Sequence, residues 1–179
     1  MSGQVDPLRR ADAEQVRAVV AALAPVTWPA DRGLVTRLAA DLGWTVEREG
    51  LSNVDLRTGL TPAARAAVSA RGDTVTRVQV DLAERADRRE PTTAARVAEA
   101  YAALLPEVTA ALGLEPTPAA RREGHEAWDL PTGGRLSLEA LSSTVVLVLL
   151  QQEWADVERS EEALGISPDR VPGPLDDLA

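Results

Sequence analysis

The fold is decided by the stretch Thr144–Leu150, which reads TVVLVLL. Every residue after the threonine is apolar, so both faces of the segment need to be shielded from water. A short apolar run of this length is typical of a strand that is covered on both sides. We therefore predict that Thr144–Leu150 is a central strand of a sheet.

Segments that alternate apolar and polar residues supply the neighbours of this strand. Thr74–Leu82 alternates along its whole length, as a half-buried strand does. Similar alternation occurs over Trp44–Leu56, and over Glu126–Leu138 on either side of a Pro-Thr-Gly-Gly turn. The alanine-rich segment Arg65–Ala70 suits a helix as well as a strand. Together these segments predict two antiparallel meanders.

Four segments carry apolar residues at helical spacing. They are Ala13–Ala24, a helix capped by Asp31 that ends before Gly43, Thr93–Leu112 and Gln152–Leu164. Asp12 and Gln15 have the spacing of a capping box at the start of the first helix. The predicted order is therefore two helices, a meander, a long helix, a second meander and a last helix.

This order predicts an α+β fold, with a mainly antiparallel sheet of five or more strands and helices packed on one face. The chain has 179 residues, which fits one domain. We expect this single domain to span residues 1–165. Residues 166–179 are rich in proline and aspartate, and we expect them to form a mobile acidic tail.

The composition excludes several classes of function. There is no cysteine, which removes disulfides, thiol nucleophiles and cysteine metal sites together. The net charge is −9, and an acidic surface repels nucleic-acid backbones, so we expect no nucleic-acid partner.

All 19 lysine-or-arginine positions are arginine and phenylalanine is absent, which indicates a GC-rich genome such as that of an actinomycete.

The location follows from what the sequence does not contain. The first residues lack the basic and apolar runs of a signal peptide, and no apolar stretch approaches the ~20 residues that span a bilayer. We therefore expect a soluble cytoplasmic protein with no membrane partner.

The search for catalytic, cofactor and metal residues predicts none. The single histidine, His125, is expected to be a polar residue on a solvated strand. No serine lies in a Gly-x-Ser-x-Gly elbow, and no spacing of metal ligands occurs. Glu158, Glu161 and Glu162 have the spacing of ordinary helix-surface charges. Scattered carboxylates that meet in space stay open as a catalytic alternative.

Trp28 is the one candidate for a partner-binding residue. It lies between Pro25 and Pro29, outside any periodic pattern. An amphipathic aromatic side chain on a proline-braced loop is typical of a binding anchor. Packing against the first helix is the other interpretation.

Two sequence runs carry a resemblance to known proteins. Leu112–Thr117 reads LGLEPT, and Trp128–Leu138 reads WDLPTGGRLSL. Over Asp31–Gly165 the chain resembles an uncharacterised actinobacterial family and the type III secretion chaperone-like and YbjN-like folds. The resemblance implies a link to toxin secretion, as an immunity protein or a chaperone, and it carries over no catalytic residue.

Three hypotheses follow from these observations. The first is a non-catalytic protein-binding module, an immunity protein that neutralises a cognate toxin. An acidic surface suits a basic toxin and speeds its association. The second is a chaperone or adaptor for a secreted substrate, which would act as a homodimer with an exposed apolar groove. The third is an enzyme that uses scattered carboxylates.

Overall fold

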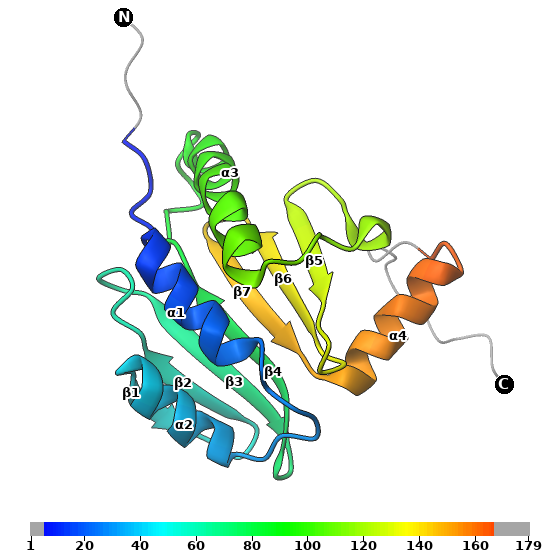
Figure 1. The fold of residues 1–179 in the computed structure, drawn as a ribbon. Helices are drawn as coiled ribbons and strands as arrows, with labels where there is room; N and C mark the ends of the chain where they lie inside the picture. The colour runs from blue at the N-terminus through cyan, green and yellow to red at the C-terminus, as the bar shows by residue number, and fades with distance from the viewer. Residues whose placement is uncertain (1–5, 167–179) are drawn as a thin grey trace, which may run out of the picture.

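The computed structural model describes residues 6–166, so the predicted tail lies outside the described part except for Ile166. The order of helices and strands agrees in part with the prediction, and a short 3₁₀ helix that was not predicted precedes the second group of strands (Figure 1). The elements are α1 (Ala13–Leu23), α2 (Gly33–Leu42), β1 (Thr45–Glu49), β2 (Asn53–Arg57), β3 (Arg65–Arg71), β4 (Thr74–Asp81), α3 (Thr93–Leu112), the short 3₁₀ helix η1 (Pro118–Ala120), β5 (His125–Asp129), β6 (Arg135–Ala140), β7 (Val145–Leu150) and α4 (Gln152–Ala163).

All seven strands belong to one sheet, in the order β1-β2-β3-β4-β7-β6-β5, and every neighbouring pair is antiparallel. The predicted α+β class and antiparallel sheet are thus confirmed. β7 lies between β4 and β6, an interior position that agrees with its apolar sequence. Leu147 and Leu149 belong to the main core, whereas Val146 and Val148 are buried on the opposite face.

The segment Arg65–Ala70, which suited either a helix or a strand, is the strand β3. It pairs with β2 on one side and β4 on the other, and it buries Ala66 and Val68. Alanine has little preference for strands, so pairing on both edges and burial decide the conformation here. The sequence pattern alone does not indicate these two long-range pairings.

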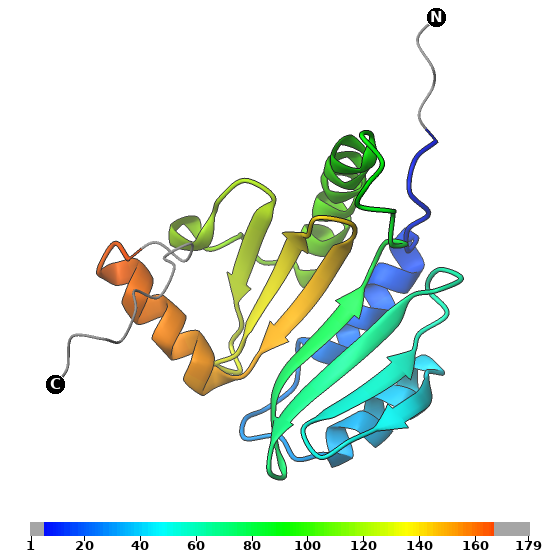
Figure 2. The ribbon, with the colours of Figure 1, turned by 180° about the vertical axis from the view of Figure 1, so that it is seen from behind.

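Three helices cover one face of the sheet. α1 packs against α2 and α3, and α3 lies over β6 and β7. In Figure 2, seen from behind, the sheet lies in front of these three helices. The capping box of Asp12 and Gln15 at the start of α1 is confirmed. The cap of α2 is shifted by one residue from the prediction: Arg32 is the cap residue, while the Asp31 carboxylate accepts a hydrogen bond from the Gly33 amide.

The prediction that all helices pack on one face is wrong for α4. Along β6, Leu136 faces the core, and Arg135 therefore faces the opposite side of the sheet. Arg135 pairs with Glu158 and Glu162 of α4, so α4 lies on that opposite side. Its contacts with the sheet include these ion pairs, and Ala155 is its one buried apolar residue, so α4 has no apolar stripe that faces the core.

None of the helices within residues 6–166 has the length and apolar character needed to cross a membrane.

Truncating the interior strand should be costly. Leu147→Ala is expected to lower the free energy of unfolding by about 2–5 kcal/mol, because the leucine is fully buried and its neighbours cannot fill the space. Leu51→Ala is the matched control, since Leu51 is 91% exposed, and it should change stability by less than about 0.5 kcal/mol. Urea unfolding measures both. Equal effects of the two variants would refute the interior position of β7.

Candidate functional site

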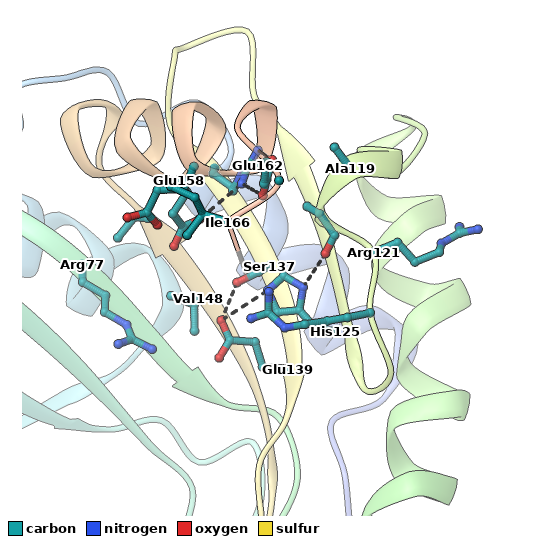
Figure 3. A pocket seen from close by; sticks show the side chains of 16 residues that line it. Arg77, Ala119, Arg121, His125, Ser137, Glu139, Val148, Glu158, Glu162 and Ile166 are labelled. Carbon is teal, nitrogen blue, oxygen red and sulfur yellow. Dashed lines mark hydrogen bonds and ion pairs between the residues drawn. The ribbon is translucent and has the colours of Figure 1, made fainter. Parts of the chain in front are cut away.

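A cavity of ≈ 550 Å³ lies between the second face of the sheet and α4, and we call it the α4 cavity. Strands β4, β7, β6 and β5 supply one wall, α4 supplies another, and the η1 region supplies the third. Figure 3 shows the side chains that reach into this space. The size falls within the range of small-molecule sites, which is about 300–1,000 Å³.

A buried arginine holds α4 over this cavity. Arg135 is only 2% exposed, although it carries a full charge. Its guanidinium donates to Asp129 of β5 at 3.0 Å, and to Glu162 at 2.6 Å and Glu158 at 3.3 Å on α4. A buried charge of this kind is tolerated only when its donors find partners. The cluster therefore ties α4 to the β5–β6 hairpin.

Arg159 reinforces the same attachment from the side of α4. Its Nε donates to Asp129 at 2.8 Å, and one of its terminal nitrogens donates to the carbonyl of Gly133 at 2.9 Å. Asp129 thus accepts from two arginines, and it also accepts from the Thr117 hydroxyl at 2.9 Å. The β5–β6 hairpin and α4 are thus joined through the Asp129 carboxylate and through the carbonyl of Gly133.

The pKa values in the cluster follow from these bonds. Burial alone would raise the pKa of Asp129, but hydrogen bonds from Arg135, Arg159 and Thr117 outweigh it and lower the pKa below its usual range. Burial alone would lower the pKa of Arg135, yet hydrogen bonds to Glu162 and Asp129 raise it. Both groups are therefore held in their charged forms.

The interpretation of Glu158, Glu161 and Glu162 as a solvated helix face is wrong in part. The Glu162 side chain is only 18% exposed, and it binds Arg135 through both of its oxygens. Glu158 is half-exposed and reaches the same guanidinium. Glu161 is exposed and forms no ion pair with another described residue, so the interpretation holds for this residue alone. The four-residue spacing of Glu158 and Glu162 places both on the side of α4 that faces the cluster.

Acid should weaken this cluster in a defined window of pH. Asp129 has a lowered pKa in the folded chain, so its contribution to stability is complete above the unfolded value of about 3.9 and is lost as the pH falls through the folded value. Asp129→Asn should therefore cost about 1–2 kcal/mol at neutral pH and progressively less below about pH 4.

The measurement is urea unfolding of both proteins across this range of pH. Asp41→Asn is the control, because Asp41 is exposed on α2 and pairs with no basic residue among residues 6–166. A difference between wild type and Asp129→Asn that stays constant down to strongly acidic pH would contradict the proposed charge cluster.

His125 is not the solvated residue that the sequence predicted. It is 9% exposed and lines the α4 cavity. Its Nδ1 lies 3.0 Å from the carbonyl oxygen of Ala120, which can only accept, so Nδ1 carries a proton. Nε2 is thereby turned toward Glu139, whose Oε1 is 3.9 Å away. The turn after η1 thus buries the ring and fixes its orientation.

Ser137, Glu139 and His125 form a small polar group on the second face of the sheet. The Ser137 hydroxyl donates to Glu139 Oε1 at 2.8 Å, and Glu139 lies directly across from His125 in the β5–β6 register. A nucleophilic triad needs the hydroxyl to donate to the imidazole. Here the carboxylate lies between the two, so the group is arranged for binding a donor and not for activating Ser137.

Arg77 supplies a cation at the β4 side of the same sheet wall. It belongs to β4, is half-buried, and its Nε is buried without a hydrogen-bond partner among residues 6–166. It takes part in none of the ion pairs within that part of the chain. Figure 3 shows Arg77 and Glu139 reaching into the space from opposite sides, with Val148 between them.

Trp28 lies outside the α4 cavity. It is half-buried and packs against the core, and it also lines a separate surface hollow with Glu153 and Asp156 of α4. Its indole closely approaches Gly134, where a Cβ atom would lie 2.5 Å from Nε1. The second glycine of the hairpin turn is therefore needed for this contact, whereas the turn itself needs the first, Gly133, whose φ is 90°.

Trp28→Ala should lower the free energy of unfolding by about 2 kcal/mol, because a half-buried indole that packs on the core is lost. Thermal unfolding measures the change. An unchanged melting temperature would show that the indole adds nothing to packing and serves only as a surface anchor.

A second surface feature is the outer face of α4, which we define as Trp154, Val157 and Leu164. These side chains are 47%, 47% and 74% exposed. Their spacing of three and seven residues places them along one stripe of the helix. The sequence predicted that they share a face, and the structure adds that this face points away from the protein.

Sequence reasoning missed the residues that build the α4 cavity. Arg77 and Arg135 were recognised only as polar positions of alternating strands, and Ser137 only as a serine without a catalytic motif. One local signal was present: Glu158 and Glu162 are four residues apart, a spacing that suits a shared partner. Nothing in the sequence named Arg135 as that partner.

The described part of the chain, residues 6–166, contains no group of three or more histidine, aspartate or glutamate side chains placed to hold a metal ion. Residues 14–151 match the model of a family of unknown function (DUF6301). No curated protein and no solved structure matches the chain significantly.

Proposed function

We propose that this chain, which belongs to the DUF6301 family, is a non-catalytic protein-binding module that neutralises a basic bacterial toxin. The observation that carries the proposal is the outer face of α4. An exposed tryptophan beside exposed aliphatic residues on a helix is typical of a protein interface, where aromatic anchors supply most of the binding energy.

Charge specifies the kind of partner. α4 carries five carboxylates against one guanidinium, and the chain as a whole has a net charge of −9. Glu153, Asp156 and Glu161 are exposed beside the apolar stripe. An apolar centre with an acidic rim complements a basic surface that carries its own apolar anchor, and it disfavours acidic partners and nucleic acid.

Trp28 extends this surface. The hollow that it lines also contains Glu153 and Asp156, which lie on the same helix as the apolar stripe. A partner that covers the first turns of α4 would therefore also contact Trp28. In this proposal Trp28 lies at the margin of the interface, and Trp154 and Val157 form its centre.

The double variant Trp154→Glu/Val157→Glu should weaken capture of the partner at least ~30-fold, which corresponds to about 2 kcal/mol. The measurement is capture from a lysate of the native host on immobilised full-length chain. The captured protein should be basic, and association should slow as salt rises, because the Debye length falls from ~30 Å at 0.01 M to ~8 Å at 0.15 M.

Leu51→Glu is the control, because it introduces a carboxylate, one where the double variant introduces two, at an exposed apolar residue in the turn between β1 and β2. It should bind as the wild type does. Equal capture by the double variant and the wild type would refute the interface, and an acidic captured protein would refute the charge argument.

Neutralisation is tested separately. The captured protein, expressed alone in a bacterial host, should stop growth, and co-expression of the wild-type chain should restore growth while the double variant does not. A captured protein that is harmless, but is exported only when this chain is present, would favour the secretion-chaperone alternative instead.

A further inference from the structure

The α4 cavity is not used by the proposed interface, and its chemistry is distinct. The outer face of α4 points away from the protein, whereas the cavity lies beneath the same helix. Four strands, α4 and the η1 region build its walls, so it is a product of the whole fold and not of one loop. A ligand there would leave the toxin-binding surface free.

Among the charged side chains that line the cavity in the described part of the chain, Arg77 is the one with a buried donor that makes no hydrogen bond. Its Nε is shielded from solvent and makes no hydrogen bond to any residue between 6 and 166. Leaving a buried donor of a charged group unpaired is costly. Because the Nε is shielded, a ligand carboxylate would accept two parallel hydrogen bonds from the terminal nitrogens of the guanidinium and would balance its charge.

The β6 side of the same sheet wall offers acceptors. Glu139 uses Oε1 for the Ser137 hydroxyl, and the same oxygen lies nearest to His125. Its Oε2 makes no hydrogen bond within the described part of the chain. An ammonium or amide N–H group is the natural donor for a half-buried carboxylate whose second oxygen is free.

The balance of charge limits the ligand further. Four arginines and four glutamates line the cavity, so their formal charges cancel. Arg135 and Arg121 are already neutralised, by Glu162 and by Glu126. A polyanion such as a nucleotide would meet as much repulsion as attraction, whereas a ligand with one charge of each sign matches Arg77 and Glu139, which lie two strands apart on the sheet.

We propose that the α4 cavity binds a small zwitterion, an amino acid or a short peptide, with its carboxylate on Arg77 and its ammonium group on Glu139. His125 and Ser137 position the Glu139 carboxylate and do not react with the ligand. The site binds without turnover, because no group in it is arranged to attack a carbonyl carbon.

The wild-type chain tests this without any variant. Isothermal titration would compare free glycine and glycylglycine with two capped forms, N-acetylglycylglycine and glycylglycinamide, and with inorganic phosphate. At least one of the two zwitterions should bind, and each capped form should bind at least about tenfold more weakly than glycylglycine, or than glycine if that is the ligand. Binding of glycine favours an amino acid, and binding of only glycylglycine favours a peptide.

Variants then assign the two ends. Arg77→Gln should abolish the preference for glycylglycine over glycylglycinamide, which lacks the free carboxylate. Glu139→Gln should abolish the preference for glycylglycine over N-acetylglycylglycine, which lacks the free ammonium group. Arg71→Gln is the control, because Arg71 is exposed at the end of β3 and does not line the cavity. No detectable binding of either zwitterion at about 10 mM, binding of phosphate as strong as that of the zwitterions, or unchanged preference in Arg77→Gln would overturn the proposal.

Discussion

The structure depends on one buried charge, the guanidinium of Arg135. It projects from β6 on the face of the sheet that α1, α2 and α3 do not cover. Without partners, a charge at this depth would cost several kcal/mol, so the three carboxylates around it are a condition of the fold. Two of those carboxylates belong to α4, and the position of the last helix follows from them.

Both surfaces to which we assign a role are consequences of this attachment. Because α4 turns its charged side toward Arg135, its apolar residues face outward, where they form the proposed interface. Because long charged side chains, with only Ala155 as a buried apolar contact, attach α4 to the sheet, a cavity remains between them. A helix with the opposite orientation would bury Trp154 and Val157 and would fill that space.

Local patterns predicted most of the architecture. Helical spacing located all four helices, and alternation located the strands on both sides of the hairpin turn. The apolar run of β7 indicated an interior strand, because no other place in the sheet would shield both of its faces. Each of these inferences depends on residues that are close together in the chain. The residues that form the pattern are also the ones that determine the local structure.

The side of the sheet on which α4 lies, and with it the cavity, could not be predicted in the same way. The position of α4 depends on pairs such as Arg135 with Glu162, which are 27 residues apart and therefore produce no periodic pattern in the sequence. His125 was misjudged for the same reason, since its burial comes from η1 and from Glu139 and not from its own strand. Long-range ion pairs of this kind become visible only when the strands are placed in register.

Hydrogen exchange of Arg135→Met tests the central claim most directly. Methionine keeps much of the side-chain volume but leaves the carboxylates of Asp129, Glu158 and Glu162 without their common cation. If Arg135 holds α4 in place, amides of α4 should exchange at least about tenfold faster than in the wild type, while those of β4 and β7 keep their protection. Unchanged protection of α4, or an equal loss of protection throughout the sheet, would contradict the account.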